Sequence, residues 1–351
     1  MSAFESLVTQ AREAAQSEGL GEGPAEGPGR NCPLDYRYNG EALACAPAVP
    51  PAQVLWIVGG LYGNVEAMHR INAMVAAEPA GTTQVVANGD FHWFDADVDD
   101  FLAIEQGTRH WQRLRGNVET ELARVVQPGQ PDAGCGCGYP ASVPQEDVDR
   151  SNLILQQLRR TCVAAGQTET LAALPMLLRA KVGSLRIGIV HGDDQSLAGW
   201  RLSHDALGDS ARSGLTAFFD AAQIDLIASS HTCLPVACTF DRPPGQHPVG
   251  LINNGAAGMA NFAGAREGVV TRIARHGIPP PPGARVLYRA QLADCDVAAV
   301  AVDFDWTQFM ARFDRTWPAG SAAAQSYRRR IVDGPDYVLD AAPRGGFQRC
   351  A

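Results

Sequence analysis

Four side chains that could bind a metal ion occur in this sequence, each directly or shortly after an apolar run. In chain order they are Asp90, Asn117, His191 and His231. A carboxylate, an amide oxygen and two imidazoles form a donor set that suits zinc, manganese or iron. A buried carboxylate is costly unless it is paired or bound to a cation. The four together predict a transition-metal site, whereas each of them alone is more typical of a turn or a hydrogen-bonded loop.

The elements that must position these residues are strands that alternate with helices. Short apolar runs predict strands over Val54–Val58, Thr83–Ala87, Trp111–Arg115, Leu185–Val190, Asp225–Ala228 and Gly250–Gly255. Apolar stripes at helical spacing predict helices over 65–77, 98–106 and 146–165. This alternation predicts an α/β fold with a mostly parallel sheet. Such sheets bind their ligands at the carboxyl ends of the strands, where the four donors lie.

Composition limits the classes of function. The chain has 351 residues, 46% of them hydrophobic, and a formal net charge of −9. That charge does not favour nonspecific nucleic-acid binding, so an anionic substrate needs a local positive centre. No apolar run has transmembrane length, and the N-terminus does not resemble a signal peptide, so we expect no membrane partner and a cytoplasmic location. The nine scattered cysteines predict reduced thiols.

Five short blocks carry a family resemblance: Gly60–Asn64, Gly89–Asp90, Gly116–Glu119, His191–Asp193 and Ser230–Cys233. Their order and character resemble the calcineurin-like metallophosphoesterases, which hydrolyse phosphate esters with two metal ions. In that family the blocks read Asp-x-His, Gly-Asp, Gly-Asn-His-Asp/Glu, a lone His and Gly-His-x-His. The resemblance covers about Val54 to Met259. It implies the calcineurin-like phosphoesterase fold, a two-sheet β-sandwich flanked by helices.

The resemblance implies that one of the two metal sites is complete. Asp90, Asn117, His191 and His231 match the ligands of the family's second ion, and we expect the first three to take part in catalysis. At the first site, Gly60, Tyr62 and Cys233 stand in place of the family's Asp, His and His.

The departures from the family motifs change the expected site. Tyr62 and Cys233 are possible additional or replacement ligands, because a phenolate oxygen can bind iron and a thiolate sulfur can bind zinc or iron. His92, just after Asp90, is a third candidate, although a solvated loop is the plainer interpretation. Tyr62 could instead simply fill the space left by the missing His. We expect one divalent ion, with two ions as the alternative and with manganese, zinc or iron as candidates.

Four further residues bear on the expected chemistry through their positions. Val118 replaces a His that many family members use to assist the leaving group. Glu119 keeps the carboxylate of its block and could orient a metal-bound water or a ligand as part of the catalytic set. Arg115 and Arg266 are the candidates for contact with the substrate phosphate.

The domain organisation is expected to have three parts. Residues 1–30 form a flexible tail, 31–305 form the metallophosphoesterase-like domain, and 306–351 form a C-terminal helical extension. An insertion at about 127–166 is expected to be a helical cap. Within it, Cys135-Gly136-Cys137 is more typical of a turn than of a structural zinc site, because a second cysteine pair is lacking.

The leading hypothesis is a divergent metal-dependent hydrolase that acts on a phosphomonoester or phosphodiester, with a nucleotide as one candidate substrate. The alternative is a catalytically impaired relative that binds a phosphorylated ligand or a protein partner. A third hypothesis is a rebuilt, even redox-active, centre at Tyr62 and Cys233. The glycines of Val58–Gly63 lack the spacing of a dinucleotide site. Substrate, oligomeric state and the role of the extension stay open.

Overall fold

The computed structural model describes residues 27–30, 32–79, 82–125, 132–141, 143–207, 209–242 and 247–350, with backbone alone at 209–213. Most of the tail expected over residues 1–30 lies outside this range. Its described end is attached to the insertion, because the Gly29 N–H donates to the Ala133 carbonyl (2.8 Å) and the Arg30 guanidinium to the Pro140 carbonyl (2.7 Å).

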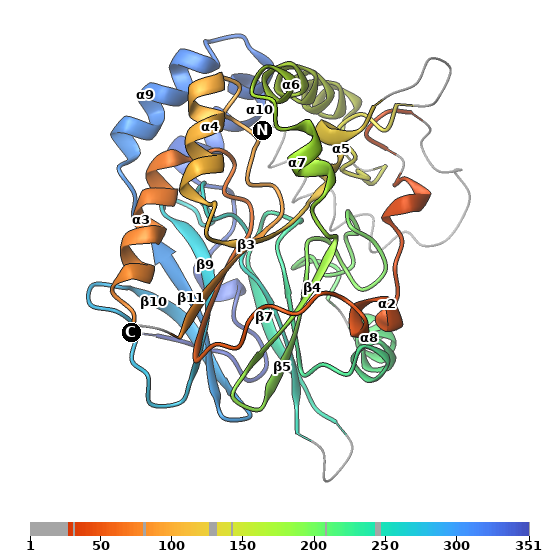
Figure 1. Cartoon of the computed structure of the whole chain (residues 1–351), viewed down its shortest axis with the longest axis vertical. Helices are drawn as coiled ribbons and strands as arrows, with labels where there is room; N and C mark the ends of the chain where they lie inside the picture. The colour runs from red at the N-terminus through yellow and green to blue at the C-terminus, as the bar shows by residue number, and fades with distance from the viewer. Residues whose placement is uncertain are drawn as a thin grey trace.

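Two β-sheets pack against each other to form a sandwich (Figure 1). The first sheet has the strand order β12 (Gln348–Arg349), β10 (Val286–Leu292), β11 (Cys295–Val302), β9 (Gly268–Arg275), β1 (Val54–Val58), β2 (Thr83–Asn88) and β3 (Gln112–Leu114). The second has the order β4 (Leu177–Val182), β5 (Leu185–Val190), β6 (Leu226–Ser229), β8 (Val249–Asn253) and β7 (Val236–Phe240).

Both sheets are mixed, so the expectation of a mostly parallel sheet was wrong. The pairs β1–β2, β2–β3, β5–β6 and β6–β8 are parallel. The pairs that involve β4, β7, β9, β10, β11 and β12 are antiparallel. Antiparallel strands can be joined by short turns and need no crossover helix. The alternation of strands and helices on which the prediction depended therefore does not reveal them.

Strand β1 illustrates why these sequences form buried strands. All five of its side chains are buried. Successive side chains point to opposite faces of a strand. Val54, Trp56 and Val58 therefore enter the core beneath the helices, whereas Leu55 and Ile57 enter the core between the two sheets. Burial on both faces explains the continuous apolar run at this position.

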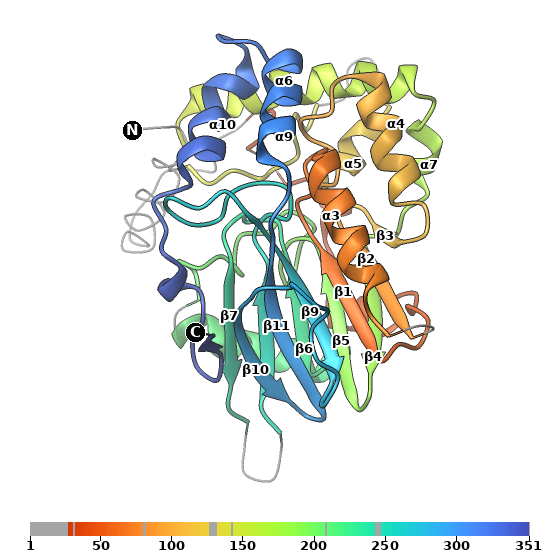
Figure 2. The same ribbon diagram turned by 90° about the vertical axis from the view of Figure 1, so that its left-hand side faces the viewer.

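Helices cover both outer faces of the sandwich. The helices and helical turns are η1 (Leu34–Tyr36), α2 (Gly40–Ala44), α3 (Val65–Ala76), α4 (Val98–Gly107), α5 (Asn117–Ala123), α6 (Gln145–Ala164), α7 (Thr168–Ala172), α8 (Asp209–Ala222), α9 (Trp306–Thr316), α10 (Ala322–Asp333) and η2 (Leu339–Ala341). Figure 2 shows α3 and α4 beside β1 and β2, with α6, α9 and α10 gathered at one end of the sheets. Helices α2 and α8 pack on the outer face of the second sheet.

The first helix of the fold begins as the sequence predicts. The Asn64 side chain accepts a hydrogen bond from the Ala67 N–H (2.9 Å) and so caps α3. Its amide nitrogen also donates to the Gly258 carbonyl (2.8 Å), which ties the helix to the distant loop after β8.

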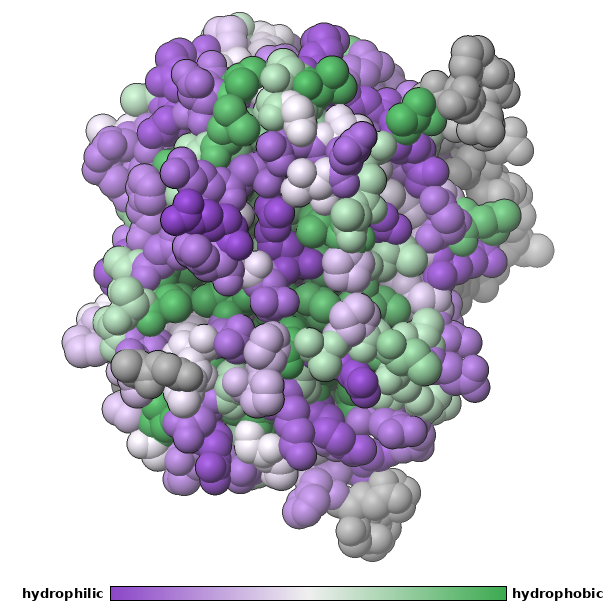
Figure 3. Space-filling view, viewed as in Figure 1, coloured by the Kyte–Doolittle hydropathy of each residue, from purple (hydrophilic) through white to green (hydrophobic). Residues whose placement is uncertain are grey.

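Hydrophilic residues dominate the face drawn in Figure 3, with apolar residues scattered among them. Within the described residues, no helix combines the length and the apolar character needed to cross a membrane.

Candidate metal centre

The four predicted donors lie together at one edge of the sandwich. Asp90 follows β2, Asn117 begins α5 just after β3, His191 follows β5 directly, and His231 comes two residues after β6. Strands β2 and β3 are parallel neighbours in one sheet, and β5 and β6 are parallel neighbours in the other. Their carboxyl ends therefore meet between the two sheets, where all four side chains are buried.

The donor atoms are spaced as ligands of a single ion. The His191 Nε2 atom lies 3.3 Å from Asp90 Oδ1, 3.1 Å from Asn117 Oδ1 and 3.2 Å from His231 Nδ1. Ligands held at about 2.0–2.2 Å from a tetrahedral ion are roughly 3.3–3.6 Å apart. The donor atoms of Asp90, His191 and His231 all lie within 4.8 Å of one another. The spacing fits a small divalent ion.

Hydrogen bonds orient the two imidazoles with their lone pairs toward this point. The His191 Nδ1–H donates to the Asn88 carbonyl (3.0 Å), and the His231 Nε2–H donates to the Cys137 carbonyl (3.2 Å). These partners fix the tautomers and leave Nε2 of His191 and Nδ1 of His231 as acceptors. Metal-binding histidines commonly use a backbone carbonyl in this way.

Asn117 is oriented by the same principle. Its amide nitrogen donates to the Cys135 carbonyl (2.9 Å), so its Oδ1 atom faces His191. Lone pairs of Asp90, Asn117, His191 and His231 therefore converge without a hydrogen atom between the neutral groups. A buried set of acceptors arranged in this way favours a cation, either the proton that Asp90 helps His191 to hold or a metal ion.

The contacts among the donors set the pKa values of three of them. Burial lowers the pKa of His191, but Asp90 beside it more than offsets this, so the pKa lies above its usual value. Burial raises the pKa of Asp90, and His191 then brings it below the usual value. Burial and the neighbouring His191 lower the pKa of His231 to about 3, which keeps that imidazole neutral and available as a ligand.

The segment Cys135–Cys137 belongs to the site through its backbone. It supplies the carbonyls that orient Asn117 and His231, and the Cys137 carbonyl also accepts from Trp200 Nε1–H (3.0 Å). Gly136 permits this approach, because its φ is +64° and a Cβ atom there would lie 2.3 Å from the Tyr36 hydroxyl oxygen. The sequence identified this segment only as a turn.

Glu119 lies behind the donors and is fully buried. Its carboxylate accepts hydrogen bonds from the backbone N–H groups of Asp90 (2.8 Å), Phe91 (3.0 Å), His92 (3.3 Å) and Gly116 (2.9 Å). It is absent from the lining of the cavity at the site. The structure therefore gives Glu119 a positioning role, in place of the contact with water or ligand that the sequence suggested.

Backbone strain concentrates at the same place. Asp90 (φ 51°), Tyr62 (φ 54°) and Cys233 (φ 61°) are non-glycine residues in the left-handed region, and all three line one cavity. Residues in this region cost free energy, and they cluster at functional sites.

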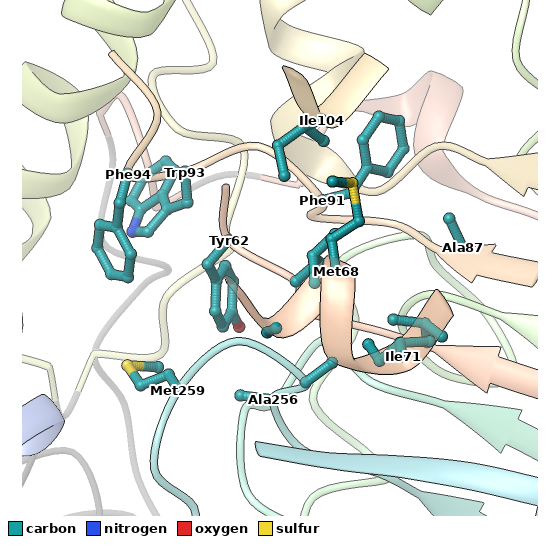
Figure 4. Packing of buried hydrophobic residues seen from close by; sticks show 14 of the residues in the cluster. Tyr62, Met68, Ile71, Ala87, Phe91, Trp93, Phe94, Ile104, Ala256 and Met259 are labelled. Carbon is teal, nitrogen blue, oxygen red and sulfur yellow. The ribbon is translucent and has the colours of Figure 1, made fainter. Parts of the chain in front are cut away.

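Tyr62 and Cys233, which stand at two ligand positions of the first ion in the family motifs, form a hydrogen bond with each other. The Tyr62 hydroxyl lies 2.8 Å from Cys233 Sγ, and burial raises the pKa of both groups. Each group is therefore the hydrogen-bond partner of the other. Gly60 leaves space for the ring, because a Cβ atom at Gly60 would lie 3.0 Å from it. Figure 4 shows Tyr62 packed among Trp93, Phe94 and Met259.

Arg330 adds a positive charge to this half of the site, and sequence reasoning missed it. It comes from α10, is 1% exposed, and donates to the carbonyls of Cys233 (2.6 Å) and Ala260 (3.1 Å). The guanidinium also lies close enough to the Cys233 thiol and the Tyr62 hydroxyl to interact with both. A fixed cation here opposes the binding of a metal ion at the same place.

His92 does not reach the donors. Its Nδ1 and Nε2 atoms lie 2.5 Å from Asp95 Oδ2 and 3.1 Å from Glu105 Oε1, and its ring stacks on Phe101. Burial lowers its pKa, but the two carboxylates raise it overall to about 9. Both ring nitrogens of His92 are engaged by carboxylates, so neither offers a lone pair to a metal ion at the four donors. The expectation that His92 is a replacement ligand is therefore corrected.

Arg115 and Arg266 also lie away from the cavity. The Arg115 guanidinium donates to the Ala172 carbonyl (3.3 Å) in α7, and the Arg266 guanidinium lies over the Trp306 ring at 4.0 Å. Neither residue is part of the cavity lining, so the expected phosphate contacts are corrected.

A cavity of about 80 Å³ opens beside the donors. Asp90, Asn117, Val118 and His231 form one side of it. The remaining walls come from Tyr62, Trp93, Cys137, Tyr139, Trp200, Ser203, His204, Asp205, Thr232, Cys233, Leu234 and Tyr327. Apart from Tyr62, the tryptophans and tyrosines of this set lie in segments without a family motif, so no sequence signal identified them.

Comparison with known proteins gives a fold but no close relative. The sequence matches no family model and no curated protein. A hypothetical protein from Pyrococcus horikoshii OT3 is similar, with 13% identity, 81% of this chain and 99% of that chain covered, and a TM-score of 0.53. A metallophosphoesterase from Sphaerobacter thermophilus aligns with 15% identity, coverage of 81% and 99%, and a TM-score of 0.49. A serine/threonine phosphatase from Saccharomyces cerevisiae aligns with 12% identity, coverage of 74% and 86%, and a TM-score of 0.37. At 13% identity the likeness to the Pyrococcus horikoshii protein concerns the fold alone. The two packed sheets of this chain themselves confirm the expected two-sheet sandwich.

Proposed function

We propose that this chain, which has the calcineurin-like metallophosphoesterase fold, is a phosphoesterase that uses a single divalent metal ion. The observation that carries the proposal is the convergence of four buried lone-pair donors, Asp90, Asn117, His191 and His231, at spacings of 3.1–3.3 Å around His191 Nε2. The expected substrate is a phosphomonoester or phosphodiester.

The ion would be held by these four residues. When bound, a divalent transition metal acidifies a coordinated water and polarises a phosphoryl oxygen. The chain supplies one negative charge to such an ion through Asp90 and three neutral donors, so a net positive charge would remain for an anionic substrate. Asp90 Oδ1 also accepts the Val118 N–H (3.2 Å), which fixes the carboxylate against the start of α5.

The surroundings of Tyr62 and Cys233 favour one bound ion over two. Tyr62 and Cys233 are bonded to each other, and Arg330 lies against them. Manganese, zinc and iron all suit the remaining donor set of oxygen and imidazole nitrogen.

Elemental mass spectrometry of the purified chain tests the proposal. We expect about one transition metal per chain in the wild type, and loss of the metal in the variants Asp90→Ala, His191→Ala and His231→Ala. His276→Ala is the matched control, because His276 is an exposed histidine just after β9 that pairs with Asp296 and not with the four donors. Unchanged metal content in both His191→Ala and His231→Ala would contradict the proposal. A metal-loaded wild type would then be tested for hydrolysis of phosphate esters.

A second candidate is a non-catalytic protein that binds a phosphorylated ligand or a protein partner. The replacement of the first ion's ligands by Gly60, Tyr62 and Cys233 favours it. Absence of turnover across metals and esters, together with thermal stabilisation by a phosphorylated ligand, would support this candidate over the enzyme.

A further inference from the structure

Tyr62 and Cys233 lie directly beside the metal donors and line the same cavity. The Tyr62 N–H donates to the Asp90 carbonyl (3.1 Å), and the Cys233 thiol donates to the His231 carbonyl (3.2 Å). Asp90 also lies close enough to act electrostatically on the Tyr62 hydroxyl and on the Cys233 thiol. A small ligand that occupies the cavity at the metal donors can therefore reach these two side chains as well.

The Tyr62 hydroxyl is a good hydrogen-bond donor that is bonded to a weak acceptor. Its oxygen lies 2.8 Å from Cys233 Sγ. Because the thiol hydrogen goes to the His231 carbonyl, the phenol O–H is the donor in this pair. Sulfur is a weak acceptor, and the Arg330 guanidinium forms a hydrogen bond with the same thiol. A charged oxygen atom would bind the phenol O–H more strongly, since charge-assisted hydrogen bonds are roughly twice as strong as neutral ones.

The charge behind these two side chains is positive. The buried Arg330 guanidinium interacts with three residues of the cavity lining, Tyr62, Cys233 and Tyr327. Asp205, the carboxylate of the described lining that lies outside the donor set, is 3.0 Å from His204 Nδ1. The end of the cavity at Tyr62 and Cys233 therefore favours an anion.

The cavity has the size of one phosphate group. Its volume is about 80 Å³. A water molecule needs roughly 10–15 Å³ by this measure, so the cavity offers space for roughly five to eight water-sized groups. One phosphorus atom with its four oxygens fits this space. A nucleobase, or the second alcohol of a phosphodiester, would have to lie outside it.

We propose that the Tyr62 hydroxyl binds a phosphoryl oxygen of the substrate, and that this substrate is a phosphomonoester. The inference rests on the proposed function, because another oxygen of the same phosphoryl group would face the metal donors. Cys233 positions the hydroxyl, and the charge of Arg330 favours the dianion of a monoester over the monoanion of a diester. A residue at a lost ligand position would thus bind the substrate instead of an ion.

Calorimetric titration of the metal-loaded full chain with inorganic phosphate tests the proposal without any need for turnover. Dimethyl phosphate serves as the diester probe, because it is a monoanion with two methyl esters. At about pH 8, where phosphate is a dianion, we expect phosphate to bind at least about tenfold more tightly than dimethyl phosphate. Equal affinities, or no binding of phosphate, would overturn the proposal.

The variant Tyr62→Phe keeps the ring and removes the hydroxyl. We expect phosphate binding to weaken roughly 10- to 100-fold at unchanged metal content, because a hydrogen bond to a charged group is lost. Tyr337→Phe is the matched control with unchanged phosphate affinity, because the buried Tyr337 hydroxyl donates to the Pro235 carbonyl (2.8 Å) outside the cavity lining. Thermal melting checks that both variants are folded. Full phosphate affinity in Tyr62→Phe, or loss of its metal, would overturn the role of Tyr62.

The variant Cys233→Ser tests the part played by the weak acceptor. A serine oxygen accepts hydrogen bonds better than sulfur does, so it would hold the Tyr62 hydroxyl more firmly. Phosphate affinity should then fall by about 3- to 10-fold. Unchanged or tighter phosphate binding would overturn the positioning role of Cys233.

The metal content of the same samples separates this inference from the proposed function. Metal uptake and ester hydrolysis, with full phosphate affinity in Tyr62→Phe, would remove the role of Tyr62 alone. Phosphate binding that needs the Tyr62 hydroxyl, in a chain that takes up no metal and hydrolyses no ester, would leave the phosphate site standing and remove the phosphoesterase.

Discussion

Glu119 acts on the donors through the backbone. Its carboxylate accepts hydrogen bonds from four main-chain N–H groups, three of them in the segment Asp90–His92 that carries the candidate metal ligand Asp90. Asp90 has φ 51°, so its conformation depends on such external support. A buried carboxylate with this many donors is a structural anchor of the site.

Glu119→Gln should therefore weaken both the fold and the metal site. An amide oxygen accepts fewer and weaker hydrogen bonds than a carboxylate, and its NH₂ group would face backbone donors, so we expect a loss of about 1–3 kcal/mol in the free energy of unfolding. Metal affinity should fall roughly 10- to 100-fold. Urea unfolding and metal titration measure the two effects. Glu146→Gln, at an exposed position of α6, is the control, and equal behaviour of the two variants would disprove the anchoring role.

A second residue-scale prediction concerns acid stability. Burial raises the pKa of Glu105, but hydrogen bonds from His92 and the nearby Arg113 lower it below its usual value. A depressed folded-state pKa stabilises the protein above the unfolded-state pKa of about 4.5, and this stabilisation is lost as the pH falls through the folded-state value. Unfolding free energies measured from about pH 6 downward should fall less steeply in Glu105→Gln than in the wild type. Parallel curves for the two proteins would contradict this assignment.

At the scale of elements, the metal donors depend on segments outside the strands that carry them. The Cys135–Cys137 segment orients Asn117 and His231 through its carbonyls, and α10 brings Arg330 to Cys233. The insertion and the C-terminal helices thus contribute to the site itself, and α6 and α10 pack against each other.

Gly136→Ala tests the role of the Cys135–Cys137 segment. The new Cβ atom would combine a left-handed backbone with a contact 2.3 Å from the Tyr36 hydroxyl, so the segment must move and metal affinity should fall at least tenfold. Gly166→Ala is a matched control, because Gly166 has a similar φ of +67° with open space around its Cβ position. In the control, backbone strain alone should lower the free energy of unfolding by about 1 kcal/mol, and metal binding should not change. A similar loss of metal in both variants would refute the role of the segment.

Arg330→Met tests the contribution of α10. The substitution leaves the buried carbonyls of Cys233 and Ala260 without their donor, so the free energy of unfolding should fall by about 2–4 kcal/mol. Arg328 lies two residues earlier on α10 and forms an exposed ion pair with Asp314. The control variant Arg328→Met should change the free energy of unfolding by less than about 0.5 kcal/mol. Denaturant melts compare the two variants, and equal effects would contradict the assigned role of Arg330.

At the scale of the whole molecule, the metal site joins the two sheets. Asp90 and Asn117 follow strands of one sheet, whereas His191 and His231 follow strands of the other. An ion bound by all four would link the two halves of the sandwich, and it would bind the folded state far better than the unfolded chain.

Removal of the metal should therefore lower thermal stability. At an ion concentration about 100 times the dissociation constant, binding stabilises the fold by about 2.7 kcal/mol. Chelation of the wild type should lower its melting temperature by several degrees, whereas chelation of Asp90→Ala should have no effect. Differential scanning fluorimetry measures both shifts, and equal shifts in the two proteins would show that the chelator acts elsewhere.

The local elements were predictable from the sequence. The run Leu185–Val190 is a strand with the predicted bounds, and Asn64 caps α3 as expected. Residue type and local spacing determine such features, because strand burial and helix caps depend on neighbours within a few residues. Three of the candidate donors, Asp90, His191 and His231, were predicted for the same reason, because each stands just beyond an apolar run.

The surroundings of the donors were decided by the tertiary structure alone. Arg330 lies 97 residues from Cys233 in the chain, and Cys137 lies 94 residues from His231, so no local pattern connects them. Arg115 stands beside the third motif, yet its side chain turns to α7. Side-chain direction and the packing of distant segments follow from the whole fold. The sequence by itself determined which side chains are candidate metal donors, because residue type sets the donor atoms. The tertiary structure decided that backbone carbonyls orient them, that Arg330 lies beside Tyr62 and Cys233, and that aromatic side chains line the cavity next to them, because these contacts join segments far apart in the chain.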